Sequence, residues 1–253
     1  MSPDPADPPW REPPAEPVAA PGAVDVWRVA LDLGGSAVER LAATLADDER
    51  ARADRLRVPG GRGRFIAGRG ALRAILGRYL GLPADRLAFR YGGRGKPALP
   101  GTGLEFNLTH SGGLALLAVT RGRAVGVDIE AARPMADADR LVERFFSPRE
   151  VAAYRALPAA ERPAAFFRCW TRKEAYMKAT GLGLGQPLDG FDVSLAPGEP
   201  PRLLAVAGRP GEADRWSMRD LDPGPGYAAA LLVEGGADLV RCYRWPGTDP
   251  ARA

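Results

Sequence analysis

The segment Phe166–Gly185, with the sequence FFRCWTRKEAYMKATGLGLG, predicts a helix that carries polar groups on a face that ought to be buried. Trp170, Glu174 and Lys178 are spaced four residues apart, so in a helix they form one stripe. A carboxylate and an ammonium on the same stripe as a tryptophan indicate a functional site rather than a plain core face. Gly181 stands where a helix C-cap favours a left-handed residue, so we expect the helix to end there.

The composition around this helix is that of a globular protein. The chain has 253 residues, 45% of them hydrophobic and 26% charged, which is enough for one or two cores. No apolar run approaches the ~20 residues that a membrane span needs, and the first residues lack the basic and apolar regions of a secretory signal. The two cysteines, Cys169 and Cys242, have no metal-ligand spacing. We therefore expect a cytoplasmic protein with reduced thiols and no membrane contact.

Arginine is concentrated in the first half of the chain. Eleven arginines occur from Arg50 to Arg90, and Arg94 follows them. A positive surface there would suit phosphate groups. The abundance of alanine, arginine, glycine and proline also fits a chain in which arginine generally replaces lysine, with no ligand involved. Nucleic acid is not an expected partner, because the stretch lacks interleaved exposed aromatic residues and any known reading motif.

Local patterns predict a mixed arrangement of helices and strands. Residues 1–22 are rich in proline and poor in apolar side chains, so we expect a disordered extension. Apolar residues at helical spacing predict further helices over residues 37–57, 65–80 and 145–157. Alternating stretches predict strands over residues 24–31, 87–91, 104–108, 114–120 and 124–130, and several short strands after residue 191.

These elements predict an α+β protein of two pseudo-symmetric lobes. Each half of the chain offers a long helix and several strands, so each lobe would be a long helix packed on a small, mostly antiparallel sheet. We expect residues 23–123 to form an N-terminal lobe, residues 124–246 a C-terminal lobe, and residues 247–253 a tail. No direct sequence repeat accompanies this symmetry.

The stretch AVGVDIE, residues 124–130, places two carboxylates on one side of a predicted strand. Side chains alternate along a strand, so Asp128 and Glu130 face one way while Val127 and Ile129 face the other. Two neighbouring carboxylates repel each other unless a cation or a shared proton lies between them. Oxygen ligands of this kind suit Mg²⁺. The alternative is an edge strand with an acidic solvent face.

The only histidine of the chain, His110, stands in FNLTHSGG, residues 106–113. We interpret THSGG as a loop between two strands, which is where functional residues concentrate. Asn107, Thr109 and Ser111 can each form hydrogen bonds with a phosphate or with an adenine edge. A packing or surface imidazole is the alternative for His110.

The loop GGRGKP, residues 92–97, lies just before that histidine and carries two cations, Arg94 and Lys96. A glycine-rich backbone with two cations can cradle a phosphate. The loop lacks the GxxxxGK[ST] spacing of a P-loop, and GLGLG lacks GxGxxG spacing and follows a helix. Both nucleoside-triphosphatase and Rossmann interpretations are therefore excluded.

Together these motifs resemble those of the 4′-phosphopantetheinyl transferases. AVGVDIE followed by FFSPRE and FFRCWTRKEAYMKATGLGLG matches the pattern GxDxE…WxxKEAxxKxxGxG. GKP and FNLTHSG are similar to motifs of the larger, two-lobed type that activates surfactin synthetase, rather than of the small trimeric holo-acyl-carrier-protein synthases. The resemblance covers Val24 to Trp245.

The resemblance implies an enzyme, expected to be a monomer, that transfers the 4′-phosphopantetheine arm of coenzyme A to a serine of a carrier protein, releasing 3′,5′-ADP. The carrier would be an acyl, polyketide or peptidyl carrier protein. Asp128, Glu130 and Glu174 would bind one Mg²⁺, in the C-terminal lobe. Glu174 would also help to deprotonate the serine, either directly or through a water, and we favour the water. Lys178 would contact a phosphate.

The resemblance also implies a coenzyme A site in the N-terminal lobe. Thr109 and His110 match positions around the 3′-phosphate, and Arg52 and Lys96 match cations that bind phosphate and adenosine groups. Arg50 or Arg55 could take the place of Arg52. The predicted coenzyme A site further includes Arg94, Asn107 and Lys178.

Five further residues in or near the helix have either two interpretations or a structural role. Glu150 matches an acidic position near the carrier serine, but it also completes a capping box with Ser147. Trp170 would seat the helix by packing, and Lys173 would form an ion pair. Phe145 and Phe146 are either one wall of a carrier-protein surface or core residues.

A protein that keeps coenzyme A or carrier binding but not catalysis is the competing hypothesis. Loss of one of the three carboxylates would favour it, and all three are present. We therefore expect an enzyme.

Overall fold

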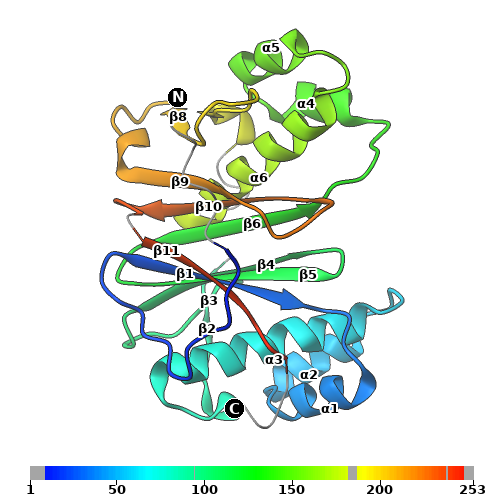
Figure 1. Cartoon of the computed structure of the whole chain (residues 1–253), viewed down its shortest axis with the longest axis vertical. Coiled ribbons are helices and arrows are strands. Elements are labelled where there is room, and N and C mark those ends of the chain that lie inside the picture. The colour runs from blue at the N-terminus through cyan, green and yellow to red at the C-terminus, as the bar shows by residue number, and fades with distance from the viewer. Residues whose placement is uncertain (1–8, 94, 182–186, 238, 248–253) are drawn as a thin grey trace. The chain divides into compact units, whose positions relative to one another are not determined.

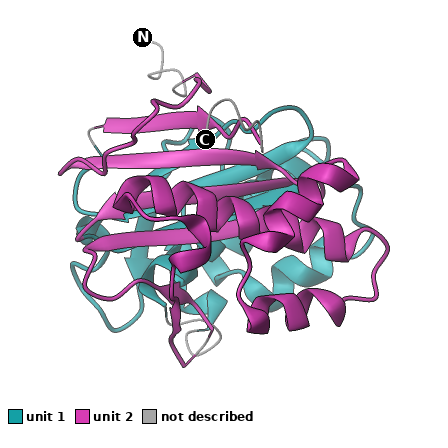
Figure 2. Cartoon of the chain, turned by 90° about the horizontal axis from the view of Figure 1, so that it is seen from below, with its two compact units in different colours: residues 1–7, 123–238 teal, residues 8–122, 239–253 magenta. Residues whose placement is uncertain are grey.

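The computed structural model describes residues 9–93, 95–181, 187–237 and 239–247 (Figure 1). Arg94 and most of the GLGLG stretch lie outside the described residues. The chain divides into two compact units, which have different colours in Figure 2. Unit 1 contains Arg123–Asp238, and unit 2 contains Pro8–Gly122 and Leu239–Ala253. Each unit has a long helix on a small sheet, which confirms the predicted α+β class.

Unit 2 is built on a four-stranded sheet in the order β11-β1-β5-β4. Its strands are β1 (Ala23–Ala30), β4 (Leu104–Ser111), β5 (Leu114–Arg121) and β11 (Leu239–Arg244), and β2 (Arg90–Tyr91) pairs with β3 (Pro97–Ala98). Its helices are α1 (Gly35–Ala43), α2 (Asp47–Asp54), α3 (Gly61–Leu80) and the short η1 (Ala84–Arg86). Trp27, Leu72, Ile75 and Leu117 are buried in its core between α3 and the sheet.

Unit 1 is built on a three-stranded antiparallel sheet in the order β6-β10-β9. Its strands are β6 (Val125–Ala131), β9 (Trp216–Leu221) and β10 (Tyr227–Glu234), and β7 (Phe191–Val193) pairs with β8 (Leu203–Val206). Its helices are α4 (Ala138–Phe145), α5 (Pro148–Ala156), α6 (Arg162–Thr180) and the short η3 (Leu188–Gly190) and η4 (Ala213–Arg215). Helix α6 packs on β6 and β10, and it ends at Gly181 with φ of 65°, as predicted.

The last strand differs from the expectation that residues 124–246 form one lobe. β11 leaves unit 1 and pairs in parallel with β1 of unit 2, with Val26 opposite Cys242. Arg241 of β11 forms an ion pair with the buried Asp25 of β1, at 2.6 Å. An alternating pattern indicates a strand but does not indicate which sheet the strand joins. The pairing of β11 with the sheet of unit 2 could therefore not be predicted from the sequence.

The proline-rich segment also differs from the prediction, because its described part packs on unit 2. Arg11 forms two backbone hydrogen bonds with β11. The Arg11 N–H donates to the Cys242 carbonyl, and the Arg244 N–H donates to the Arg11 carbonyl. Arg78 of α3 donates to the carbonyl of Pro14 at 2.5 Å. Proline lacks a donor but keeps its carbonyl, so arginines can hold the segment in place of a hydrophobic core.

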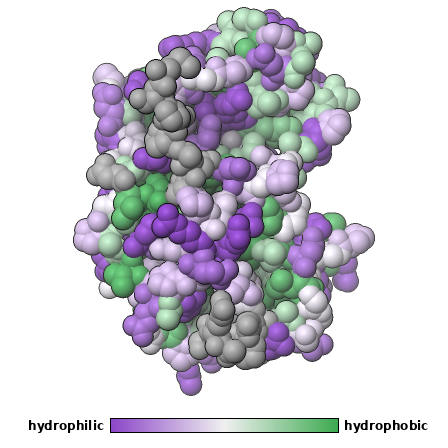
Figure 3. Space-filling view, viewed as in Figure 1, coloured by the Kyte–Doolittle hydropathy of each residue, from purple (hydrophilic) through white to green (hydrophobic). Residues whose placement is uncertain are grey.

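The predicted helix over residues 37–57 is two helices. α1 ends at Ala43, with Thr44 as its C-cap, and α2 begins after Ala46, whose N–H donates to the Glu49 side chain at 2.9 Å. The expected helix over residues 145–157 is α5, which begins at Pro148 after the N-cap Ser147, whereas α4 before it was not predicted. No described helix is long and apolar enough to cross a membrane. Hydrophilic residues are interspersed with hydrophobic ones on the face in Figure 3.

Helix α2 is attached to α3 through a buried carboxylate. Glu49 forms ion pairs with Arg69 and, at 2.5 Å, with Arg73, whose side chain is only 2% exposed. Burial raises the pKa of Glu49, but hydrogen bonds from Arg73, the Ala46 N–H and Arg69 outweigh it, so the pKa lies below its usual value. Arg52 is on the same helix, so the cluster also positions one predicted coenzyme A residue.

We expect Glu49→Gln to lower the free energy of unfolding by about 3 kcal/mol, because two arginines lose a buried counter-charge. Since the folded pKa is depressed, the carboxylate stabilises the fold above the usual glutamate pKa of 4.5. That contribution disappears as pH falls through the folded pKa. Urea unfolding between pH 3 and 7 measures both effects, and the variant should show the weaker acid dependence. Asp47→Asn, which breaks the exposed pair with Arg50, is the control, with a loss of about 0–1 kcal/mol.

Candidate active site

Helix α6 lies directly against β6 because residue 126 is glycine. A Cβ at this position would stand 2.1 Å from the Ala175 carbonyl oxygen and 2.4 Å from the Ala179 nitrogen. Both are backbone atoms of α6, so no side chain could rotate away to make room. The missing Cβ therefore lets the turns that carry Glu174 and Lys178 lie on the strand that carries Asp128. This role of Gly126 was not predicted, although the glycine of GxDxE was the available signal.

Asp128 and Lys178 form the central contact of the site. Asp128 points toward α6 from the middle of β6 and is 3% exposed. The Lys178 ammonium lies 2.5 Å from its Oδ1, and the lysine side chain is 28% exposed. On the neighbouring strand, Ala230 and Ala228 stand opposite Asp128 and Glu130, so small side chains flank both carboxylates. The structure thus brings together Asp128 and Lys178, two of the predicted site residues.

The electrostatics link these residues to Glu130 and Glu174. Burial raises the pKa of Asp128 to about 6 against the opposing charge of Lys178, and the charges of Glu130 and Glu174 add to the rise. Burial likewise raises the pKa of Glu174, which Lys178 lowers and Glu130 raises. The charges of the three predicted metal carboxylates therefore interact, and the ammonium of Lys178 lies beside them.

The donor set suits a hard divalent cation in its chemistry. Mg²⁺ prefers oxygen ligands and commonly takes one or two carboxylates, with waters and substrate phosphates completing its shell. A cation would also relieve the repulsion that raises the pKa of Asp128 and Glu174. In the part of the chain that the structure describes, however, no three metal-ligating side chains form a ready-made cluster. Lys178 supplies the positive charge at Asp128.

Glu150 and Lys173 belong to the framework behind the site. Glu150 is 1% exposed and completes the capping box of α5 with Ser147. It also accepts from the Val193 N–H at 2.7 Å and pairs with Lys173 at 2.6 Å. Lys173 donates further to the Phe191 carbonyl at 2.6 Å. These contacts support the capping role of Glu150 over a contact with the carrier serine, and they give Lys173 its expected ion pair.

The aromatic residues near α6 are mainly packing residues. Trp170 stacks on Phe166 at 5.7 Å between ring centroids and meets Phe145 edge-on at 5.8 Å. Phe146 is 3% exposed and stacks on Phe166, so it is a core residue. Phe145 is half-buried, and of the two candidates for a carrier-protein wall it alone retains partial exposure.

Breaking the Glu150–Lys173 pair should destabilise unit 1. We expect Lys173→Met to lower the free energy of unfolding by about 3–5 kcal/mol, since it leaves a buried carboxylate without its counter-ion. Adding Glu150→Gln should recover part of that loss, because the buried charge is then removed as well. Urea unfolding measures both variants. Arg155→Met, which breaks an exposed pair with Glu143, is the control; an equal loss in this control would contradict the expectation.

In unit 2, β4 carries Asn107, Thr109 and His110. The expected THSGG loop is wrong: β4 continues to Ser111, with His110 opposite Ala115, and the turn is left to two glycines. Hairpin pairing thus extends further than the polar sequence suggested. Asn107 and Thr109 are buried, whereas His110 is exposed. Since side chains alternate, His110 lies on the opposite face from Asn107 and Thr109.

The predicted cations of unit 2 have different surroundings. The Arg52 guanidinium is exposed and lies over the Phe65 ring, 5.3 Å from its centroid. Arg50 pairs with Asp47 at 2.8 Å, while Arg55 caps the end of α2. Burial lowers the pKa of Lys96, against the opposing charge of Glu105. Of the three arginines, only Arg52 has its guanidinium over an aromatic ring of the described residues. This contact positions the guanidinium and leaves its positive charge uncompensated.

Carboxylates with raised pKa beside a lysine, held between a strand and a helix, are typical of an enzyme site. The sequence profile of the 4′-phosphopantetheinyl transferase superfamily matches residues 124–232, which contain β6 and α6.

Three curated relatives agree with that profile. 4′-phosphopantetheinyl transferase HetI of a Nostoc strain is 45% identical over 216 residues, which cover 84% of this chain and 88% of HetI. A putative 4′-phosphopantetheinyl transferase of Synechocystis is 37% identical, over 58% of this chain and 61% of the relative. 4′-phosphopantetheinyl transferase Sfp of Bacillus subtilis is 32% identical, over 52% and 58%. The chain belongs to the 4′-phosphopantetheinyl transferase family and is a transferase, as its motifs predicted.

Proposed function

We propose that this transferase moves the 4′-phosphopantetheine arm of coenzyme A to a serine of a carrier protein, with Mg²⁺, and releases 3′,5′-ADP. The observation that carries the proposal is the contact of Lys178 with the buried Asp128, within reach of the charges of Glu130 and Glu174. This arrangement lies in the segment that matches the family profile.

The reaction forms a bond between the serine Oγ and the phosphorus that carries the pantetheine arm, and it breaks the bond from that phosphorus to the 3′,5′-ADP oxygen. Lys178 contacts a phosphate as a compact positive charge. Asp128 holds that ammonium in place from its buried position on β6. Glu174 receives the proton of the serine, either directly or through a water, and we favour the water because bound Mg²⁺ would make the carboxylate a weaker base.

Asp128, Glu130 and Glu174 are the residues proposed to hold Mg²⁺. When bound, the ion would supply positive charge to the phosphate oxygens as the phosphoanhydride bond breaks. Substrate phosphates would provide some of its ligands, so the proposal does not require a complete cage of carboxylates before substrate binds.

We assign coenzyme A binding to the predicted residues of unit 2, namely Arg52, Lys96, Asn107, Thr109 and His110, with Arg94 outside the described residues. The lowered pKa of Lys96 supports this assignment, because a bound phosphate would stabilise an ammonium that burial disfavours. Thr109 and Asn107 add polar side chains on one face of β4, and His110 would act from the other face.

The proposal extends to acyl, polyketide and peptidyl carrier proteins, with the enzyme acting as a monomer in the cytoplasm. Cys169 and Cys242 are buried and form no disulfide, which suits a reducing compartment. Light scattering would test the oligomeric state.

The test of the activity is direct. The protein is incubated with coenzyme A, Mg²⁺ and an apo carrier protein, and the carrier is weighed by mass spectrometry. We expect the mass of one phosphopantetheine to be added, and EDTA to prevent the addition. Absence of transfer to several acyl and peptidyl carriers, with or without EDTA, would refute the proposed reaction.

A further inference from the structure

Unit 1 contains a groove of about 1060 Å³ that none of the proposed active-site residues lines. One wall of this β9 groove is Trp216–Asp220, and the other is Gly198–Leu204. Side chains of consecutive strand residues point to opposite faces. A groove that meets every residue from Trp216 to Asp220 must therefore run along the edge of β9 and not over one face.

The edge of β9 toward this groove is not paired. In the described parts of the chain, β9 pairs only with β10, and β8 pairs only with β7. In an antiparallel pair, each strand turns half of its backbone N–H and C=O groups toward its other side. The outward groups of β9 have no backbone partner among the described residues. An unpaired edge of this kind is a template for another strand.

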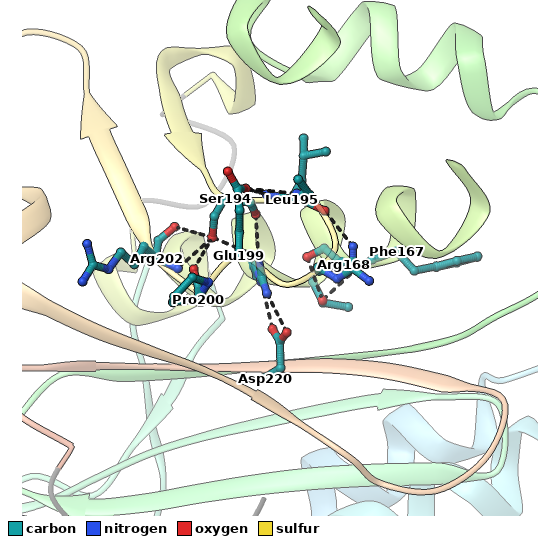
Figure 4. A network of polar contacts seen from close by, with 11 residues as sticks. Phe167, Arg168, Ser194, Leu195, Glu199, Pro200, Arg202 and Asp220 are labelled. Carbon is teal, nitrogen blue, oxygen red and sulfur yellow. Dashed lines mark hydrogen bonds and ion pairs between the residues drawn. The ribbon is translucent and has the colours of Figure 1, made fainter. Parts of the chain in front are cut away.

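The floor of the groove is rigid and polar. Arg172 of α6 is 1% exposed, and it donates to both carboxylate oxygens of Asp220, at 2.8 and 2.6 Å. It also donates to the carbonyl and hydroxyl of Ser194. Figure 4 shows Asp220 rising from β9 toward this network. The network fixes β9 against α6, so a strand that added to the edge would meet a preformed surface.

Three arginines at the groove keep N–H donors that form no hydrogen bond within the described parts of the chain. Among the described residues, Arg168 donates only to the Leu195 carbonyl, and Arg219 only to the Ala237 carbonyl, at 2.7 and 3.0 Å. The Arg202 guanidinium has no hydrogen bond or ion pair in the described part of the chain and points away from the network in Figure 4. Burial and the charge of Arg172 lower the pKa of Arg168, so a negative partner would stabilise its charge.

The charges at the groove favour an acidic partner. Four arginines line it against three acids, Glu199, Asp214 and Asp220, so its net charge is positive. Asp220 is already neutralised by Arg172. Glu199 accepts from the Leu195 and Ala196 N–H groups, which partly satisfies its charge. The remaining arginines can pair with carboxylates without a change in the fold.

From these observations we propose that the β9 groove binds an extended acidic segment of another protein, which pairs with β9 as an added strand and contacts Arg202 and Arg219 through alternate side chains. Main-chain hydrogen bonds supply affinity in this mode of recognition, and side chains at every second residue supply specificity. The site is separate from the proposed active site, so binding and transfer give independent results.

The test uses fluorescein-labelled six-residue peptides, matched to the six residues of β9. Fluorescence anisotropy should show that a peptide of alternating glutamate and threonine binds the full chain and that its lysine–threonine counterpart does not. Arg202→Ala/Arg219→Ala should weaken binding by about tenfold or more and leave transfer to a carrier protein unchanged. Arg209→Ala, an exposed arginine outside the groove, is the matched control and should bind as the wild type does.

Backbone pairing has its own test. Strand addition uses only every second N–H of the peptide, so N-methylation of one alternating set should abolish binding and methylation of the other should not. Equal binding of the lysine peptide, unchanged binding by the double arginine variant, or no binding of the acidic peptide would overturn the proposal. Displacement by tripolyphosphate, with N-methylation having no effect, would also overturn it, since the groove would then be a simple anion site.

Discussion

The Glu174→Gln variant should transfer phosphopantetheine about 10³-fold more slowly than the wild type, because a general base contributes about 10²–10⁴-fold to a rate. Glutamine keeps the size and one oxygen of the side chain but cannot accept the proton. The wild-type rate should climb with pH as the Glu174 carboxyl loses its proton, because only the carboxylate can accept the serine proton. The variant should lack this climb.

Initial rates with coenzyme A and an apo carrier protein, measured from pH 5 to 9, test this expectation. Glu161→Gln is the matched control, because Glu161 is the exposed residue that precedes α6. Its pH profile should coincide with that of the wild type. Full recovery of the Glu174→Gln rate at high pH would argue against a base role and leave Glu174 with a purely electrostatic one.

The second large effect is expected from the smallest substitution, Gly126→Ala. The added methyl group would meet backbone atoms of α6 at 2.1 and 2.4 Å, so helix and strand must separate. Overpacking of this kind costs about 1–3 kcal/mol of stability. A displacement of about 1 Å can lower a rate about 10²-fold, and this one moves Glu174 and Lys178 away from Asp128. We therefore expect a folded protein with about 1% of the transfer rate.

Gly190→Ala separates this effect from a general intolerance of alanine. A Cβ at Gly190 would have its nearest neighbour at 3.9 Å, in ordinary contact with the Pro187 ring. Its transfer rate and urea midpoint should match those of the wild type. A Gly126→Ala protein with wild-type activity would show that the spacing between β6 and α6 does not control the site.

The parts of the fold that follow from local chemistry were predictable from the sequence. α6 was expected because its apolar period ends at Gly181, where the observed φ is positive. β6 was expected because valine and isoleucine alternate with other residues. The same local patterns predicted Asp128, Glu174 and Lys178 as site residues. The predicted family membership is confirmed by the relatives.

Features that depend on distant partners were not predictable. The partner of β11 is β1, more than two hundred residues earlier, and no periodicity records that pairing. The proline-rich segment has no core of its own, so its packing depends on Arg78 and on β11. His110 was expected in a loop because its neighbours are polar, whereas register with β5 determines its place in a strand. The close approach at Gly126 likewise requires two elements.

The return of β11 to the sheet of unit 2 sets an order for synthesis on the ribosome. The part of unit 1 that carries its helices and strands is the single segment Arg123–Asp238, and all of its strands emerge before Leu239. Unit 2 starts earlier, but until Leu239–Arg244 has left the exit tunnel β1 remains an open edge and the Asp25 carboxylate lacks Arg241. Domains usually complete folding from the N-terminal side during translation. Here the unit that begins first must finish last, so a chaperone that shields exposed strands would find its target in the earlier half of the nascent chain.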